Sequence, residues 1–296
     1  MDYLEKYSYA PDLGRISSAI QAIVSNLDNM ATPEILKRCF SFMDLTTLHP
    51  NDTVASVSKL VGKVNSLKTE YPDYPMPASI CVFPNFVPVV CGCRRSDAIR
   101  VTSVAGCFPA SQSFLEVKVK ECEMAVLAGA DEVDIVLALN AFLAGDYRSA
   151  GEEIRAIRCA VDAAAAKQGR TVVLKVILET GVLKTPENIA AASFLAMEAG
   201  ADFIKTSTGK VEVNATPVAA YIMCESIRKY YAQTGRAVGF KAAGGISDSM
   251  DALSYYFIGE TVLGEEWMNR DRFRFGVSRL GNSLMGAIEQ KTVNYF

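Results

Sequence analysis

Eight short apolar, β-branched segments recur along the 296-residue chain, and a longer stretch with helical periodicity follows each of them. Strict alternation of strands and helices predicts the α/β class with a parallel sheet, because parallel neighbours need a crossover connection. Eight such units within about 250 residues match the size of a closed (β/α)8 TIM barrel. The segments expected to form the strands are residues 38–45, 78–83, 98–106, 130–137, 171–178, 201–207, 237–244 and 273–278.

A doubly wound open sheet is the competing α/β architecture. It is usually marked by a glycine-rich turn after the first strand. The first expected strand continues into "MDLTTLHPNDT", which contains no glycine, so the barrel is favoured. We expect a single domain over residues 1–296, with an N-terminal helical extension at 1–35 and a C-terminal tail at 290–296. The helix expected at 12–30 would close the bottom of the barrel or contribute to a subunit contact.

Charge and cysteine content argue against several functional classes. Lys and Arg number 30 against 33 Asp and Glu, so nothing indicates nucleic-acid or membrane binding. No apolar run approaches the roughly 20 residues that cross a bilayer, and the first residues show no signal-peptide pattern. The eight cysteines and single histidine lack zinc-ligand spacing, which indicates reduced thiols and no metal site. We therefore expect a cytoplasmic protein.

Charged and polar residues stand at the ends of several expected strands, the usual position of a barrel active site. A charge within a β-branched run is costly to bury, so it needs a partner or a catalytic role. Lys175 and Glu179 could pair with each other, and a structural ion pair explains them as well as a functional role does. The polar residues at the strand ends are Asp44, Thr46, Asp134, Lys175, Glu179, Lys205 and Lys241.

Lys205 and Lys241 end neighbouring expected strands, in the segments "DFIK" and "VGFK". Two ammonium groups about 5 Å apart repel by roughly 3 kcal/mol at an effective dielectric constant of about 20. That repulsion equals about two pKa units and would lower a lysine pKa from roughly 10.4 toward about 8. A neutral lysine amine can attack a carbonyl carbon and form a Schiff base. The paired lysines therefore predict a Schiff-base enzyme rather than a structural protein.

Several segments together carry a resemblance to a known family. In order and spacing, "MDLTTL", "GADEVDIVL", "LKVILETG", "ADFIKTSTGK", "VNATP" and "VGFKAAGG" resemble deoxyribose-phosphate aldolase, from about residue 38 to about residue 284. The resemblance implies a class I aldolase on a (β/α) barrel, without metal or cofactor. The implied reaction interconverts 2-deoxy-D-ribose 5-phosphate with D-glyceraldehyde 3-phosphate and acetaldehyde.

The resemblance also implies roles for individual residues. Lys205 matches the Schiff-base lysine, Lys241 the lysine that perturbs its pKa, and Asp134 the general acid/base. The residues that would contact the sugar are Asp44, Thr46, Lys175 and Thr208. The residues that would bind its phosphate are Gly209, Lys210, Gly244, Gly245, Gly276, Ser278 and Arg279. The implied partner is this phosphorylated sugar, and a homodimer is implied by analogy alone.

Three positions depart from the family pattern. Ala242 stands where a proline is common, Ser247 where an arginine is common, and Arg279 where a serine is common. One hypothesis is that Arg279 supplies the phosphate-binding cation missing at Ser247. The departures also leave open a catalytically weakened barrel that serves as a scaffold or binding protein. Another Schiff-base barrel aldolase is a further alternative.

Three other positions have weaker signals. Tyr295, in the tail "KTVNYF", corresponds imperfectly to a terminal tyrosine that reaches the active site in some family members, and a frayed tail explains it equally well. His49 lies in a loop past a strand end and could contact a ligand, although a surface histidine is the commoner case. Cys81 is expected to be a buried, unreactive thiol.

Overall fold

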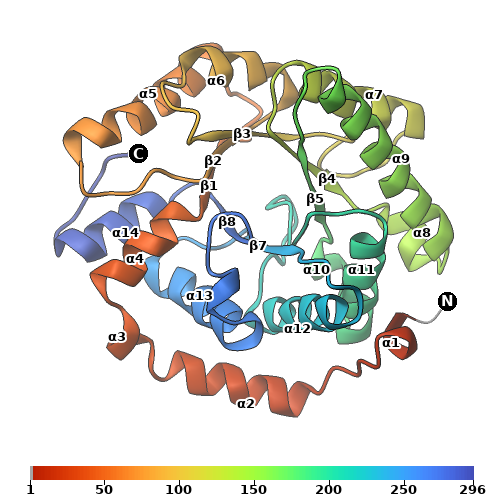
Figure 1. Cartoon of the computed structure of the whole chain (residues 1–296). Coiled ribbons are helices and arrows are strands. Elements are labelled where there is room, and N and C mark those ends of the chain that lie inside the picture. The colour runs from red at the N-terminus through yellow and green to blue at the C-terminus, as the bar shows by residue number, and fades with distance from the viewer. Residues whose placement is uncertain (1–2) are drawn as a thin grey trace.

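The computed structural model describes residues 3–296 and forms one closed barrel of eight parallel strands (Figure 1). The strands follow one another around the barrel in chain order, and the last pairs with the first to close it. This topology confirms the predicted (β/α)8 barrel. The strands are β1 Met43–Thr46, β2 Ser79–Val82, β3 Arg100–Val104, β4 Glu132–Val136, β5 Val173–Ile177, β6 Phe203–Lys205, β7 Gly239–Ala243 and β8 Phe273–Val277.

Helices ring the barrel and cover the outer faces of the strands (Figure 1). Several begin at a polar cap: the side chains of Asp146, Thr185 and Thr216 each accept a hydrogen bond from an amide of the first turn. The helices after β1 are α5 Val54–Glu70, α6 Val87–Cys93, α7 Leu115–Leu127, α8 Leu139–Leu143, α9 Tyr147–Ala166, α10 Thr180–Leu183, α11 Pro186–Glu198, α12 Pro217–Thr234, α13 Ser249–Leu263 and α14 Leu280–Glu289, with 3₁₀ turns η1 Pro84–Phe86 and η2 Glu265–Trp267.

The first strand begins later than predicted. Residues 38–41 form the end of helix α4 (Pro33–Ser41), which starts at the cap residue Thr32 and has proline at its first position. Cys39 and Phe40 are fully buried on the inner face of this helix. A short apolar run cannot be assigned to helix or strand from periodicity alone, which explains the wrong boundary.

An N-terminal extension precedes α4 and consists of α1 Tyr3–Lys6, α2 Leu13–Val24 and α3 Leu27–Met30. It runs along the outside of α11, α12 and α13 (Figure 1). The ring of Tyr7 stacks on Phe194 of α11, with 4.2 Å between ring centroids. The predicted position below the barrel is therefore wrong, because this segment buries its apolar side chains against the outer helices. The first two residues of the extension lie outside the described residues.

Strand residues alternate between the helices and the inside of the barrel. Outward-facing side chains such as Leu45, Val133 and Ile204 are apolar and buried. The inward positions are more polar than those of most barrels, whose interiors are filled by branched aliphatic side chains. The fully buried polar side chains of the strands include Asp44, Ser79, Thr102, Glu132, Asp134, Lys175, Lys241 and Arg274.

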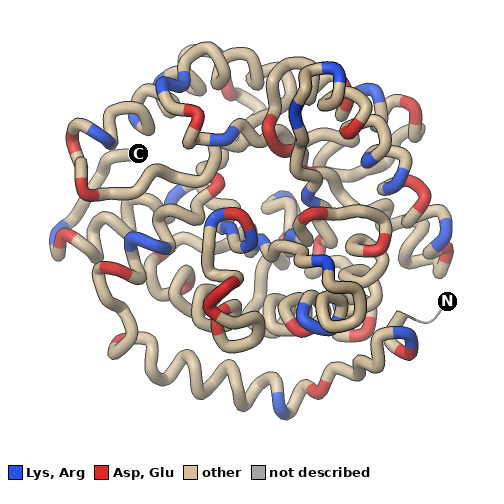
Figure 2. The backbone as a smooth tube through the Cα atoms, viewed as in Figure 1, with Lys and Arg blue, Asp and Glu red and all other residues tan. Residues whose placement is uncertain are grey.

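The outer surface carries mixed charge. Basic and acidic residues are interspersed around the ring of helices, and the view in Figure 2 shows no face of a single sign. This view therefore shows no continuous basic surface of the kind that binds a nucleic-acid backbone. Among residues 3–296, no helix combines the length and apolar character needed to cross a membrane.

Candidate active site

A network of buried charges occupies the inside of the barrel, and we call it the ionic cluster. Neighbouring members contact one another directly from different strands, at N–O distances of 3.4 Å or less. Each member is at most 4% exposed. The cluster consists of Asp44, Glu132, Asp134, Lys175, Lys205, Lys241 and Arg274.

The two lysines predicted to interact lie side by side in this cluster. Lys205 ends β6 and is in register with Lys241 on β7. Their Nζ atoms lie 3.0 and 2.8 Å from the same oxygen, Oδ2 of Asp134. The closed barrel therefore brings the two amines together, which is the arrangement that the Schiff-base prediction requires.

The two lysines experience opposite pKa shifts. Burial and then the positive charge of Lys241 lower the pKa of Lys205 below its ordinary value. Burial would also lower the pKa of Lys241, but the carboxylates of Asp134 and Asp44 outweigh burial and raise it. The geometry thus favours a neutral amine on Lys205 and a permanent ammonium on Lys241.

Asp134 holds the two lysines in place. Burial alone would raise the pKa of its carboxyl group, but the charges of Lys175, Lys241 and Lys205 outweigh burial and lower it well below its usual range. Asp134 is therefore ionised at neutral pH. In this state it can accept a proton, as a general base must.

A pocket of about 220 Å³ lies at the C-terminal ends of the strands, and Lys205 is the member of the ionic cluster that lines it. Its walls come from the ends of β1, β6, β7 and β8 and from the segments that follow these strands. Lys205 is 4% exposed, so the amine borders the pocket while most of its side chain is covered. This is the end of the barrel where TIM-barrel enzymes have their active sites.

Most of the predicted phosphate site lines the same pocket. Gly209, Gly244 and Gly245 have φ angles of 78°, 86° and 80°, in the left-handed region that favours glycine. A side chain at Gly244 would place its Cβ 2.6 Å from Oδ1 of Asn214. Glycine-rich turns of this kind leave backbone amides accessible to an anion. The predicted phosphate-site residues that line the pocket are Gly209, Lys210, Gly244, Gly245, Gly276 and Ser278.

Arg279 does not line this pocket. It occupies the N-cap position of α14, where it is exposed. Lys210 does line the pocket, and its Nζ donates a hydrogen bond to the carbonyl of Leu48 at 2.7 Å. The structure therefore does not support Arg279 as the replacement cation for Ser247, and it places Lys210 at the pocket instead.

The predicted sugar-binding residues separate into two groups. Thr46 and Thr208 line the pocket. The hydroxyl of Thr208 donates a hydrogen bond to Glu179 at 2.5 Å, and that of Thr46 donates to the carbonyl of Asp44 at 2.9 Å. Asp44 and Lys175 are fully buried and do not line the pocket, so their direct contact with substrate stays a prediction.

Lys175 does not pair with Glu179, contrary to the structural alternative raised by the sequence. Its Nζ lies 2.5 Å from Glu132, 2.9 Å from Asp134 and 3.4 Å from Asp44. Glu179 follows β5 in a left-handed conformation, with φ of 54°, and accepts hydrogen bonds outside this cluster. Proximity in the sequence did not predict the partner of Lys175, because the closed barrel places carboxylates of β1 and β4 beside it.

Glu132 and Arg274 belong to the cluster although the sequence pattern had given them no role. Arg274 contacts Asp44, and its Nη2 donates to Glu132 at 2.7 Å. Both residues interrupt apolar strand segments, just as Lys205 and Lys241 do. A charge within a strand needs a partner, and this signal was sufficient to identify them.

Two further residues of the pocket had no assigned role. Oδ1 of Asn214 is buried and has no hydrogen-bond partner among the described residues, so it can accept a hydrogen bond from a ligand. Asn214 belongs to the quoted segment "VNATP", although the residue itself was not singled out. His49 is exposed, as expected of a surface histidine, and it also lines the pocket, where a ligand contact stays a prediction. Cys81 is fully buried, and burial raises the pKa of its thiol, as expected for an unreactive cysteine.

The C-terminal tail packs away from the pocket. The hydroxyl of Tyr295 donates to the carbonyl of Lys63 on α5 at 2.7 Å. The side chain of Asn282 accepts hydrogen bonds from the amides of Tyr295 and Phe296. Neither expectation for Tyr295 is correct, because these contacts hold the tail in place on the outside of the barrel.

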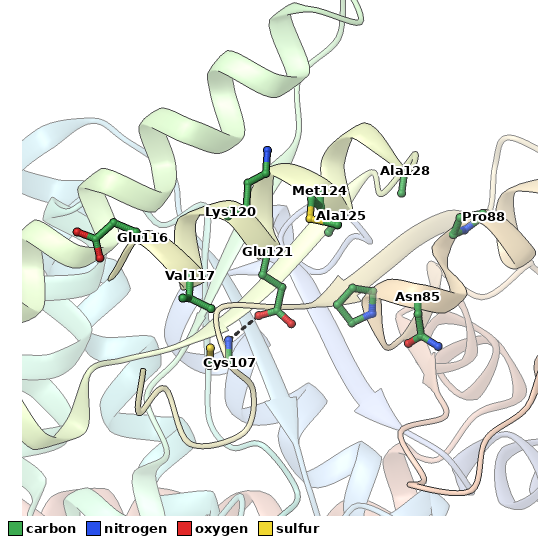
Figure 3. Close-up of a pocket in the computed structure, with 11 residues that line it drawn as sticks. Asn85, Pro88, Cys107, Glu116, Val117, Lys120, Glu121, Met124, Ala125 and Ala128 are labelled. Atoms are coloured by element: carbon green, nitrogen blue, oxygen red, sulfur yellow. Dashed lines mark hydrogen bonds between the residues drawn. The ribbon is translucent and has the colours of Figure 1, made fainter. Parts of the chain in front are cut away.

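A larger pocket, of about 820 Å³, lies outside the barrel between α7 and the segment that follows β2. Figure 3 shows Val117, Glu121 and Met124 of α7 on one side and Asn85 and Pro88 on the other. The pocket includes no member of the ionic cluster, so it lacks the paired lysines. Among residues 3–296, no group of three or more His, Cys, Asp or Glu side chains is placed to hold a metal ion.

Comparison with known proteins agrees with this geometry. The family described as "DeoC/LacD family aldolase" matches residues 39–254. A Caenorhabditis elegans protein provisionally named a deoxyribose-phosphate aldolase is 39% identical over 272 residues, which cover 91% of this chain and 86% of that protein. The structure of deoxyribose phosphate aldolase from Aeropyrum pernix is 26% identical, with a TM-score of 0.66 over 95% of this chain and 98% of that one.

A second solved structure, named QR15 and described as an aldolase, is 29% identical, with a TM-score of 0.65 over 85% of this chain and 95% of that one. The family match extends over well more than half of the chain and includes the segments that place Asp44, Asp134, Lys205 and Lys241 in the barrel. The chain therefore belongs to the DeoC/LacD family of aldolases.

Proposed function

We propose that this aldolase reversibly cleaves 2-deoxy-D-ribose 5-phosphate to D-glyceraldehyde 3-phosphate and acetaldehyde, through a Schiff base on Lys205, in the breakdown of deoxyribonucleotides. The observation that carries the proposal is the position of Lys205, a buried amine of lowered pKa that borders a pocket lined by glycine-rich turns. The names of the C. elegans and A. pernix relatives support the choice of substrate.

The contacts of the lysines favour Lys205 as the nucleophile over Lys241. Lys241 does not line the pocket, and its Nζ lies 2.5 Å from Asp44 and 2.8 Å from Asp134. Two carboxylates therefore hold it as an ammonium, which has no lone pair to attack a carbonyl carbon. Lys205 contacts Asp134 alone among the described carboxylates.

These positions support the following cleavage steps. The neutral amine of Lys205 attacks C1 of the open-chain sugar, and loss of water leaves an iminium that can accept electrons. Asp134, acting through a water molecule, removes the proton from the C3 hydroxyl, and the C2–C3 bond breaks as its electrons move toward the iminium. Glyceraldehyde 3-phosphate leaves, the enamine is protonated at carbon, and hydrolysis releases acetaldehyde and restores Lys205. Proton transfers of this type contribute about 10²–10⁴-fold.

Reductive trapping tests the Schiff base directly. Incubation with acetaldehyde and sodium borohydride, followed by peptide mass mapping, should find a reduced ethyl adduct on Lys205. An adduct on a different lysine, or none, would contradict the proposal. Turnover of 2-deoxy-D-ribose 5-phosphate is measured in parallel, because trapping without cleavage would instead support the weakened barrel that binds but does not turn over.

Phosphate recognition provides a second prediction, at Lys210. Replacing Lys210 with methionine should raise KM for 2-deoxy-D-ribose 5-phosphate by about tenfold or more, because a charged hydrogen bond contributes about 1.5–3 kcal/mol. KM for unphosphorylated deoxyribose should change little. Arg279→Met is the comparison, and its effect should be smaller because Arg279 does not line the pocket. A larger effect at Arg279, confined to the phosphorylated sugar, would restore the hypothesis that Arg279 replaces the missing cation.

We also propose that the protein forms a homodimer through α7. Several large hydrophobic side chains are exposed on α7 and at its N-cap. Phe114 is 79% exposed, Met124 58% and Val117 49%. Val117 and Met124 line the 820 Å³ pocket of Figure 3, which could receive side chains from a second copy. The A. pernix aldolase is described as tetrameric, which supports self-association in the family.

A charge on this helix tests the dimer. Met124→Glu should convert a dimer to a monomer in light-scattering measurements, because a carboxylate is unfavourable in an apolar interface. Val54→Glu is the matched control, since Val54 is 60% exposed on α5 and should tolerate the same change. A wild-type protein that is monomeric at micromolar concentration would refute the dimer.

We place this activity in the cytoplasm. The cysteines of the described residues form no disulfide, and free thiols are typical of a reducing compartment.

A further inference from the structure

The ionic cluster contains more bases than acids. Its carboxylates are three, Asp44, Glu132 and Asp134, whereas its bases are four: Lys175, Lys205, Lys241 and Arg274. Burying a charge without a compensating partner is strongly unfavourable. The favoured state of the cluster therefore has three negative and three positive charges, and one base must be neutral.

The contacts decide which base is neutral. A guanidinium does not lose its proton in proteins, so Arg274 stays charged. Lys175 lies within 3.4 Å of three carboxylates, and Lys241 lies within 2.8 Å of two. Lys205 contacts one carboxylate, which it shares with Lys175 and Lys241. Lys205 is therefore the base that can lose its proton with the least loss of ion pairing.

Three further groups border the cluster, and the two arginines among them lie at the end of the barrel opposite Lys205. Arg100 of β3 reaches Glu132 from outside, but it is partly exposed and also pairs with Asp271 at 2.6 Å. Arg270, before β8, donates to the carbonyls of Ala78 and Ala98 and borders Arg274 at the end of the barrel opposite the pocket. Burial raises the pKa of the Cys81 thiol on β2, so it stays uncharged.

We propose that Arg274 and Glu132, neither of which lines the pocket, are positioning residues that keep Lys205 neutral by setting the net charge of the cluster. The inference rests on the proposed role of Lys205 as the nucleophile. It adds Glu132 of β4 and Arg274 of β8 to Lys241 as residues that determine the protonation state of Lys205. In this account Arg274 supplies the third positive charge, which would otherwise fall to Lys205.

Two substitutions should act in opposite directions. Arg274→Met removes one fixed positive charge, so the three carboxylates would hold protons on all three lysines and Lys205 would become an ammonium. Glu132→Gln removes one negative charge, so Lys175 loses its 2.5 Å partner and the pressure to deprotonate Lys205 increases. The double variant Glu132→Gln/Arg274→Met again has equal numbers of acids and charged bases, with Lys205 neutral.

The experiment measures the rate of reductive trapping with acetaldehyde and cyanoborohydride as a function of pH. Trapping needs the neutral amine, so its rate rises with pH through the pKa of Lys205. The midpoint should move to higher pH in Arg274→Met, and trapping at neutral pH should slow about tenfold for every pH unit that the midpoint moves. It should move to lower pH in Glu132→Gln and return toward the wild-type midpoint in the double variant.

A matched control separates charge from stability. Lys118 of α7 is a buried lysine, 2% exposed, paired with Glu153 at 2.8 Å outside the barrel. Lys118→Met removes a buried cation from its partner, yet it should leave the midpoint of trapping unchanged. Circular dichroism checks folding, and if Arg274→Met does not fold, the single Glu132→Gln and the double variant still carry the test.

The outcomes distinguish this inference from the proposed function. Failure of the wild-type protein to trap at Lys205 would refute the nucleophile itself. Trapping at Lys205 with the same midpoint in folded Arg274→Met and Glu132→Gln would refute the charge balance and leave the nucleophile standing. Shifts of both variants in the same direction, or a double variant that fails to recover, would also overturn the inference.

Discussion

Replacing Lys205 with methionine is expected to abolish cleavage of 2-deoxy-D-ribose 5-phosphate, with a loss of at least about 10⁴-fold in kcat. Methionine fills similar space but has no amine, so no Schiff base can form and the electrons of the C2–C3 bond have no acceptor. The fold should be preserved, because Asp134 keeps its contacts with Lys175 and Lys241 at 2.9 and 2.8 Å.

The measurement is steady-state turnover together with trapping by acetaldehyde and borohydride. Lys167→Met is a suitable control, since the Lys167 side chain is 62% exposed on the outer surface and its nearest carboxylate is 3.4 Å away. That variant should turn over like the wild type. Near-normal turnover by the Lys205 variant would mean that the reaction proceeds without this lysine, and the proposed mechanism would be wrong.

Lys241→Met is expected to have the second largest effect, and its effect should depend on pH. The charge of Lys241 helps to lower the pKa of Lys205, so removing it should raise that pKa. Neutral Lys205 is the reactive form, so kcat/KM falls below this pKa, and a higher pKa moves the acid limb of the profile to higher pH. A rise of about two pH units corresponds to about a 100-fold loss at neutral pH, partly recovered in alkaline buffer.

This variant should also be less stable. Asp134 and Asp44 lose a partner inside the barrel, and removal of one member of a buried ion pair costs about 3–5 kcal/mol. Asp44 keeps Lys175 and Arg274, and Asp134 keeps Lys175, which should limit the loss. Thermal denaturation measures the loss of stability. The pH profile of kcat/KM, measured on folded protein, tests the effect on the pKa of Lys205. An acid limb at the wild-type pH would show that Lys241 does not tune Lys205.

Much of the barrel could be predicted because strand formation and helix formation depend on local patterns. β-Branched runs alternating with helical periodicity require parallel strands, and eight of them close a barrel. The exception is the run at residues 38–45, where the first half belongs to α4. Its apolar residues suit a buried helix as well as a strand, so only packing decided between them.

The part of the candidate site that could be predicted is the contact between residues at the ends of neighbouring strands. Lys205 and Lys241 end neighbouring strands, so sequential order is enough to bring them together. Partners across the barrel were not predictable in this way. Lys175 contacts Glu132 and Asp44 from β4 and β1, because closure of the barrel brings distant strands within the length of a side chain.

Loop positions were the least predictable. Arg279 and Lys210 both follow strand ends, and the sequence offered no reason to place only Lys210 at the pocket. Asn282 fixes the tail on the outside of the barrel, which no property of Tyr295 reveals. Loop and tail conformations depend on contacts with segments far away in the chain, so their direction emerges only when the whole fold is present.

The sequence by itself indicated the barrel and the two lysines, because periodic burial and charges within strands are local properties, and it indicated the family through the resemblance of its motifs. Only the tertiary structure decided which carboxylates each buried base contacts, and these contacts support the proposal that Lys205 is the neutral one. Protonation inside a barrel depends on the balance of all the charges that closure brings together, and those charges come from strands far apart in the chain.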